Sequence, residues 1–135
     1  MLEARARLLH DRLMSLVTRV MEIRGLVLVD RSGLPLVSTL GSGHLEEGLA
    51  AFAALATEQM ERAQQEFAMG PLNLMHLAGR DRQVFLTPLT PDVTLVAIVD
   101  AGATASTVNL HLLGMCREIL AVLMSGEGET EAEEP

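Results

Sequence analysis

The stretch Gly25-Leu-Val-Leu-Val-Asp-Arg-Ser-Gly-Leu-Pro-Leu36 predicts a β-hairpin, and the rest of the fold can be worked out from it. Its four apolar residues, 26–29, form the first strand, and residues 30–33 supply a turn that ends in a glycine able to adopt positive φ. The second strand, 34–38, contains Pro35, which has no N–H for the ladder, so this strand is expected at a sheet edge. Because the first strand is apolar at every position, we expect the sheet to be covered on both faces.

Apolar residues spaced three and four apart predict three helices, and shorter apolar runs predict three further strands. The helices are expected over residues 2–23, 44–68 and from about 104 onward, and the strands over 72–77, 83–87 and 93–99. Short links make most strand pairs antiparallel, because a parallel pair needs a crossover of about a dozen residues. The predicted fold class is α/β (α+β): a helix-strand-strand-helix-strand-strand-strand-helix sandwich with a five-stranded, mostly antiparallel sheet and helices on both faces.

The 135 residues are enough for one domain with one core, which we place at residues 1–124. The remaining stretch, 125–135, holds five of the 18 acidic residues and few groups that could be buried. We expect it to be a disordered acidic tail that is dispensable for folding.

Composition excludes several classes of protein. A net charge of −8 and an aromatic content of three Phe argue against a nucleic-acid partner. All ten basic residues are Arg, so mechanisms that need a lysine, such as that of the P-loop, are excluded. The single cysteine excludes an internal disulfide and is typical of a reducing compartment. No apolar run reaches the roughly 18 residues of a membrane span, so we expect a cytoplasmic protein with no membrane insertion.

The chain shows no catalytic constellation. Its four histidines, at positions 10, 44, 76 and 111, are isolated from one another and lack metal-ligand spacing. Cys116 lies on the apolar face of the last predicted helix, which favours a buried small hydrophobe over a nucleophile. Asp30 and Asp100 each follow an apolar strand and are better explained as the polar end of that strand than as a catalytic pair. We therefore predict no catalytic residues, no metal, no cofactor and no enzymatic activity.

The second predicted helix has a face whose middle lacks charged side chains. Opposite the apolar stripe that includes Leu45, Phe52 and Phe67, its middle carries small residues where a solvated helix normally carries charges; these are Ala50, Ala51, Ala54 and Thr57. Small residues let a second backbone approach closely, so this face predicts a contact with another helix. The alternative is that alanine is present only for its helix propensity.

Four pieces of the sequence resemble the roadblock family of dynein light chains, most nearly its bacterial members of the MglB type. They are the stretch quoted at the start, then Leu49-Ala-Ala-Phe-Ala-Ala-Leu55, Gln83-Val-Phe-Leu-Thr-Pro-Leu89 and Asp92-Val-Thr-Leu-Val-Ala-Ile-Val99. They occur in the family's order and span about residues 5–124. One departure is Thr104-Ala-Ser-Thr107, where family members often have glycine, which affects the expected local turn.

The resemblance implies the same fold and also a homodimer. In the family, the third strands of two protomers pair across a two-fold axis, and the second helices pack antiparallel on the continuous sheet. Mapped onto this chain, the implied dimer interface comprises Ala50, Ala51, Ala54, Thr57, Leu72, Leu74 and His76.

The resemblance also implies a function. Bacterial roadblock dimers regulate Ras-like small GTPases, and MglB-type members activate hydrolysis through the paired second helices without inserting an arginine. The implied partner-binding residues are the exposed Glu47, Glu58, Glu61, Arg62 and Gln65. The alternative is a dimeric scaffold with no effect on GTP hydrolysis. A small-molecule sensor would need converging polar groups, which the strands do not offer.

Overall fold

The computed structural model describes residues 2–41 and 43–133, with side chains described for 3–41 and 43–125. Its elements, in chain order, are α1 (Leu2–Arg19), β1 (Ile23–Asp30), β2 (Pro35–Ser38), α2 (His44–Glu66), β3 (Met75–Ala78), β4 (Arg82–Thr90), β5 (Val93–Asp100) and α3 (Ala105–Glu133). This order confirms the predicted fold. α3 continues to Glu133, but the side chains beyond Ser125 lie outside those described. The acidic tail at 125–135 therefore stays a prediction.

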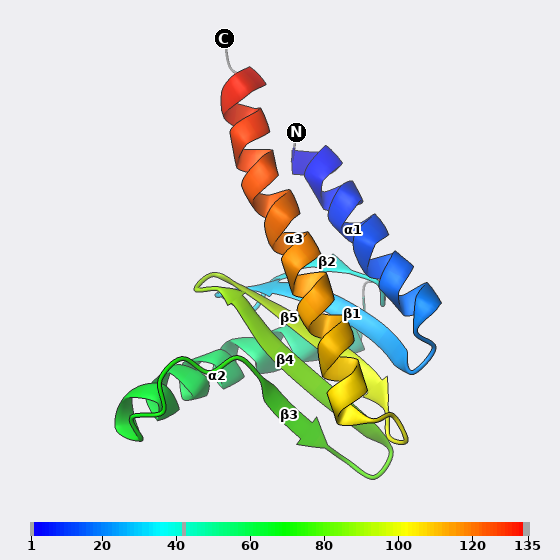
Figure 1. Ribbon diagram of the computed structural model, residues 1–135, viewed down its shortest axis with the longest axis vertical. Helices are drawn as coiled ribbons and strands as arrows, with labels where there is room; N and C mark the ends of the chain where they lie inside the picture. The colour runs from blue at the N-terminus through cyan, green and yellow to red at the C-terminus, as the bar shows by residue number, and fades with distance from the viewer. Residues whose placement is uncertain (1, 42, 134–135) are drawn as a thin grey trace.

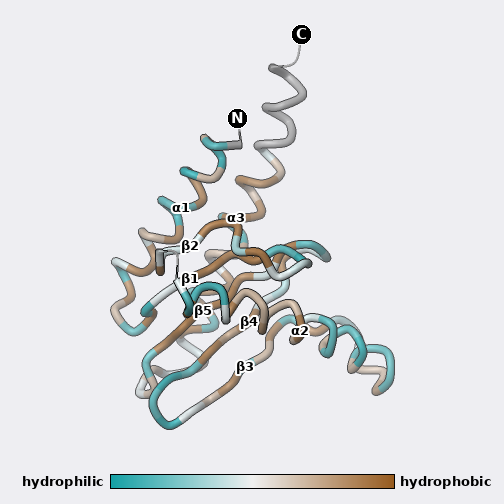
Figure 2. Tube along the Cα trace, turned by 180° about the vertical axis from the view of Figure 1, so that it is seen from behind, coloured by the Kyte–Doolittle hydropathy of each residue, from teal (hydrophilic) through white to brown (hydrophobic). Residues whose placement is uncertain are grey.

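The five strands form one antiparallel sheet in the order β2-β1-β5-β4-β3. α1 and α3 lie together on one face, and α2 crosses the other (Figure 1). Alternate residues of β1 enter two separate cores: Leu26 and Leu28 pack under α1 and α3, whereas Val27 and Val29 pack under α2. This explains why residues 26–29 of β1 are all apolar. Figure 2 shows the central strands as hydrophobic, whereas hydrophilic and hydrophobic residues alternate along α1.

The small residues of α2 pack against the sheet. Ala50, Ala53, Ala56 and Met60 are buried in the core beneath the helix. The β1–β2 turn also comes close to α2, because a Cβ on Gly33 would lie 3.4 Å from the Ala54 Cβ. Gly33 has φ +92°, a conformation that L side chains rarely adopt. Alanines on this side of α2 therefore let both the sheet and the turn approach the helix.

Several predicted boundaries are wrong; for example, the strand predicted over 83–87 continues as β4 to Thr90. α1 ends at Arg19 rather than near residue 23, because Ile23 starts β1 and is buried in the core. The third strand begins at Met75 rather than at Leu72, and the Leu72 N–H donates to Gln64 Oε1 at 2.6 Å instead of joining a ladder. The segment before β3 is therefore tied to α2.

Arg31 and Asp30 hold the β1–β2 turn in place. The Asp30 carboxylate accepts hydrogen bonds from the Ser32 N–H, the Ser32 hydroxyl and the Leu34 N–H. The neighbouring Arg31 donates to the Pro91 carbonyl at 3.0 Å and forms an ion pair with Glu61 of α2 at 3.1 Å. These bonds connect the turn to the β4–β5 turn and to α2.

The Asp30 interactions predict a defined pH dependence. The Leu34 N–H, followed by the Ser32 hydroxyl, lowers the pKa of the Asp30 carboxyl below its ordinary value. A carboxyl whose pKa is lowered by folding stabilises the protein above its unfolded pKa of about 3.9, and that stabilisation is lost as pH falls through the folded pKa. Asp30→Asn keeps an oxygen that can accept the same bonds but does not titrate. We expect its free energy of unfolding, measured in urea at pH 7 and near pH 3, to fall less on acidification than that of the parent.

Asp30→Ala is the control for this prediction, because it removes the acceptor as well as the charge. It should lower stability at neutral pH, where Asp30→Asn stays close to the parent. An Asp30→Asn protein with the same loss on acidification as the parent would show that this carboxylate does not link folding to pH.

Gln83 is the most highly connected buried polar side chain of the described sheet. It lies on β4, is 5% exposed, and its Nε2 donates to the carbonyls of Asp100 at 3.0 Å and Ala103 at 2.9 Å. Because the amide nitrogen faces carbonyl groups, the amide oxygen must be the acceptor for His76 Nε2, 2.7 Å away. The His76 ring also stacks on Phe85, with centroids 4.3 Å apart. Gln83 thus joins the edge strand β3 to the loop that leads into α3.

Candidate protein-interaction site

The two edges of the sheet differ in how they are protected. β2 has Pro35 as its first residue and a register shift opposite Leu28 and Val29, and both features discourage a further strand from pairing. This confirms the expected edge position of the Pro35 strand. β3 contains no proline and pairs with β4 in an unbroken register from Met75 to Ala78. β3 is therefore the edge better suited to accept another strand.

The outer side of β3 presents unused backbone groups. The Gly79 N–H donates to the Arg82 carbonyl at 2.9 Å, which makes these two residues a hydrogen-bonded pair across the hairpin. Antiparallel pairs alternate, so the backbone N–H and C=O of Ala78 and His76 point away from β4. A strand lying alongside could bond to both residues.

One flank of α2 is exposed and apolar, and it faces the same edge. α2 packs mainly on β1, β2 and β5, which leaves β4 and the edge strand β3 less covered on this face. At a helical repeat of 3.6 residues, Leu45, Phe52 and Leu55 fall on one exposed side; Phe52 is 41% and Leu55 64% exposed. We call the surface formed by Leu45, Phe52, Leu55 and the outer edge of β3 the α2–β3 face.

A groove of about 360 Å³ lies between the C-terminal part of α2 and the start of β3. Gln59, Ala63 and Phe67 line it from α2, and Met75 lines it from β3. Leu77, two residues further along β3, is 42% exposed. Arg62 and Glu66 also line the groove, so apolar and charged side chains together connect the helix to the strand there.

The structure corrects the predicted orientation of α2. Ala50 was expected on a bare outer face, but it is fully buried against the sheet. The Thr57 hydroxyl bonds to the Ala53 carbonyl at 2.8 Å and lies 3.4 Å from the Thr94 hydroxyl of β5, so Thr57 also faces the sheet. Ala54 is half-buried and lies beside Gly33, and only Ala51 of the four small residues is exposed. Conversely, Phe52 belongs to the exposed flank although we expected it to be in the core.

The predicted strand residues of the interface are only partly brought together. His76 lies on β3 as expected, whereas Leu72 and Leu74 precede the strand and are half-buried. Leu72 lines the groove, and Leu74 packs against the core under α1 and α3. Leu45 and Phe67 were expected in the core stripe of this helix but are exposed, and Leu55, which was assigned to neither the core nor the interface, is exposed too.

The five predicted partner-binding residues all lie on α2. Glu47, Glu58 and Gln65 are exposed, on the side of the helix away from Leu45 and Phe52. Glu61 is half-buried and paired with Arg31, and Arg62 pairs with Glu66 at 3.1 Å. The first three are therefore available for a partner, whereas the other two already have ion-pair partners.

Within the described residues, no group of three or more His, Cys, Asp or Glu could hold a metal ion. Burial raises the pKa of the Cys116 thiol to about 11, which keeps the thiol protonated and unreactive at neutral pH. Asp30 and Asp100 lie at opposite ends of the β1–β5 ladder, and Asp100 accepts a 2.7 Å hydrogen bond from Arg24. The two carboxylates therefore have separate structural partners.

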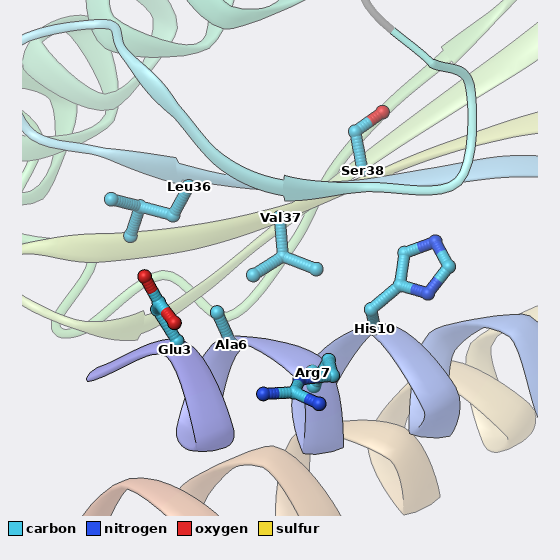
Figure 3. A pocket seen from close by; sticks show the side chains of 7 residues that line it. All are labelled: Glu3, Ala6, Arg7, His10, Leu36, Val37 and Ser38. Carbon is cyan, nitrogen blue, oxygen red and sulfur yellow. The ribbon is translucent and has the colours of Figure 1, made fainter. Parts of the chain in front are cut away.

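A second hollow, of about 530 Å³, lies between α1 and β2. Figure 3 shows Leu36 and Val37 both pointing toward α1, where Ala6 and His10 form the opposite wall. The register shift in β2 accounts for two neighbouring side chains on one side of the strand. Glu3 and Arg7 bring opposite charges to the same hollow, so it has no single charge preference.

Comparison with known proteins identifies the family. The family model of the Roadblock/LC7 domain matches residues 9–99. The chain belongs to the Roadblock/LC7 family. No curated protein matches the sequence.

Solved Roadblock/LC7 structures share the fold at low sequence identity. A Roadblock/LC7 domain from Streptomyces avermitilis is 17% identical, with a TM-score of 0.78 over 85% of this chain and 97% of that one. MglB from Myxococcus xanthus is 18% identical, with a TM-score of 0.78 over 87% and 95% of the two chains. The gliding protein MglB from Thermus thermophilus is 17% identical, with a TM-score of 0.72 over 88% of each chain. These likenesses establish the roadblock fold.

Proposed function

We propose that this Roadblock/LC7 chain is a non-enzymatic homodimeric module that binds and regulates a Ras-like small GTPase. The main support for the dimer is the α2–β3 face, where an unprotected strand edge with free backbone groups lies next to an exposed apolar flank of the helix. A second copy related by a two-fold axis would both pair with the free strand edge and cover the apolar flank of the helix. Its β3 bonds to the outer groups of His76 and Ala78, and its α2 covers the uncovered end of the sheet.

Fold neighbours support self-association. One of them is an MglB described as having a tetrameric arrangement, with a TM-score of 0.77 and 15% identity. Such assemblies require surfaces that bind further copies of the chain. The two edges of this sheet are not equivalent, and the pairing we propose uses β3, since Pro35 and the register shift disfavour β2.

The GTPase assignment rests on the likeness to MglB proteins and on the side of α2 that the dimer leaves free. Leu45 and Phe52 turn toward the two-fold axis, so Glu47, Glu58 and Gln65 stay exposed to a further partner. Each of these side chains occurs twice in a dimer. An exposed charge of this kind governs encounter rate and orientation more than it governs folding.

Reversing two of these charges tests the assignment. In Glu47→Arg/Glu58→Arg, each protomer changes by four charge units on one helix side. We expect at least about a tenfold loss of affinity for the GTP-bound partner, because charge reversal replaces attraction with repulsion at both copies. Binding and phosphate release would be measured with Ras-like GTPases encoded in the same genome. Asp11→Arg, an exposed reversal on α1, is the matched control and should bind as the parent does.

The same experiment separates regulator from scaffold. A parent protein that binds the GTPase and alters its phosphate release or nucleotide exchange supports regulation. Binding with both rates unchanged supports the scaffold alternative. No binding to any Ras-like GTPase of that genome overturns the GTPase assignment but leaves the homodimer standing, since the dimer is tested separately by mass.

A further inference from the structure

The outer side of α3 is apolar although it faces away from the core. Val108, Leu112 and Ile119 are buried on the inner side of the helix. On the outer side, Leu110 is 70%, Leu113 41% and Met124 71% exposed. We call the exposed residues Leu110, Leu113, Gly114, Arg117, Ala121 and Met124 the α3 stripe. A helix that covers a sheet normally presents polar side chains on this side, so the stripe is an unpartnered apolar surface.

The spacing of the α3 stripe is that of a helix-packing seam. Apart from the adjacent Leu113 and Gly114, its members follow one another at intervals of three and four residues, the repeat with which two helices interlock side chains. Gly114 and Ala121 have little or no side chain and leave room for a neighbouring backbone. Because both sides of the helix are apolar, Ala105–Ser125 has the length and composition of a membrane-spanning helix. In the folded domain 33% of this segment is buried.

Arg117 is the charge at the centre of the α3 stripe. Among the α3 side chains that the structure describes, which end at Ser125, the other charged one is Glu118, which faces α1 and lies 3.6 Å from Arg12. Arg117 is exposed and forms no ion pair with any residue that the structure describes. A surface that is otherwise apolar thus presents one unpaired positive charge between Leu113 and Ala121.

We propose that the α3 stripe docks an amphipathic helix of a partner protein, with a carboxylate of that helix opposite Arg117. The positive charge of Arg117 favours a partner helix with a carboxylate over a second copy of the chain. A parallel α3 pair in register, or an antiparallel pair that matches Leu110 with Met124, would bring Arg117 against its own copy. Charge also disfavours a lipid surface, because burial of the stripe in hydrocarbon would place the guanidinium at its centre. The stripe lies on the opposite side of the sheet from α2, so the inference does not rest on the proposed function.

A charge-swap experiment tests the proposal with the full chain. The probe is a labelled synthetic helix of about six turns, with Leu at intervals of three and four, Gln and Lys elsewhere, and one central Glu. A second peptide has Arg in place of that Glu. By fluorescence anisotropy, the parent should bind the Glu peptide at least about tenfold more tightly than the Arg peptide. Arg117→Glu should reverse the order of the two peptides, and Met124→Glu should abolish binding of both.

Met21→Glu is the matched control, since Met21 is 78% exposed outside the α3 stripe, and it should bind both peptides as the parent does. Circular dichroism would verify that each variant is folded. The proposal is overturned by failure of the Glu peptide to bind at 100-fold above the protein concentration, or by equal affinity for both peptides. Binding to phosphatidylglycerol vesicles that is lost in Met124→Glu would also overturn it, in favour of a membrane surface.

Discussion

Phe52→Glu is expected to convert the protein from a dimer to a monomer. The side chain is 41% exposed in the single chain, so the substitution should cost the protomer little. In the proposed dimer the α2 flank is covered by its two-fold copy, and the variant would bury two unpaired carboxylates near the axis. Loss of an interface aromatic anchor alone typically costs about 2–4 kcal/mol, so the dissociation constant should rise at least about 30-fold.

Light scattering during gel filtration would measure this change. The parent should elute at twice the 14.5 kDa mass of the chain, and Phe52→Glu at that mass, with unchanged helicity. Leu34→Glu is the matched control, because Leu34 is 61% exposed on the β1–β2 turn and lies outside the α2–β3 face. A Phe52→Glu protein that keeps the parent's mass would remove α2 from the interface.

Gln83→Leu is expected to be the most damaging change within the protomer. Leucine fills a similar volume but cannot donate to the Asp100 and Ala103 carbonyls or accept from His76. Buried acceptors left without partners cost about 1–3 kcal/mol each, and because these two carbonyls are only part-buried the total should be about 2–4 kcal/mol. For a domain of this size the melting temperature should fall by about 10 °C or more.

Thr87→Val is the control for Gln83→Leu. Thr87 lies four residues further along β4, is buried, and its hydroxyl has no hydrogen-bond partner among the described residues. Removing that hydroxyl should leave stability unchanged or raise it by about 1 kcal/mol. Equal losses of stability in the two variants would mean that β4 tolerates no substitution and that the Gln83 hydrogen bonds make no specific contribution to stability.

Much of the fold could be predicted from local sequence. Pro35 indicated an edge strand, and the unbroken apolar runs of β1 and β5 indicated a sheet covered on both faces; the structure confirms both. The start of β3 could not be predicted, because Leu72 and Leu74 continue the apolar pattern of Met75. The bond between the Leu72 N–H and Gln64, eight residues earlier, decides that boundary.

The orientation of α2 was the main error, and its cause is physical. Apolar spacing shows that Leu45, Phe52 and Phe67 avoid water, but it does not distinguish a core from an interface. The close approach of Gly33 to Ala54 determines which side of the helix faces the sheet, and this contact joins residues 21 positions apart. Neither helix propensity nor hydropathy contains that information.

Disulfide crosslinking along β3 tests the central claim most directly. Met75→Cys, His76→Cys, Leu77→Cys and Ala78→Cys would be oxidised mildly and compared with Leu36→Cys on β2. The buried Cys116 adds no background, because its thiol pKa of about 11 keeps it unreactive. If two β3 strands pair across a two-fold axis, opposed Cβ atoms lie about 4.5–5.5 Å apart, within reach of a disulfide after small adjustment. We expect reducible dimers at one or more β3 positions and none at Leu36→Cys; no crosslinking at any of the four β3 positions, or crosslinking at Leu36→Cys alone, would rule out a dimer paired through β3.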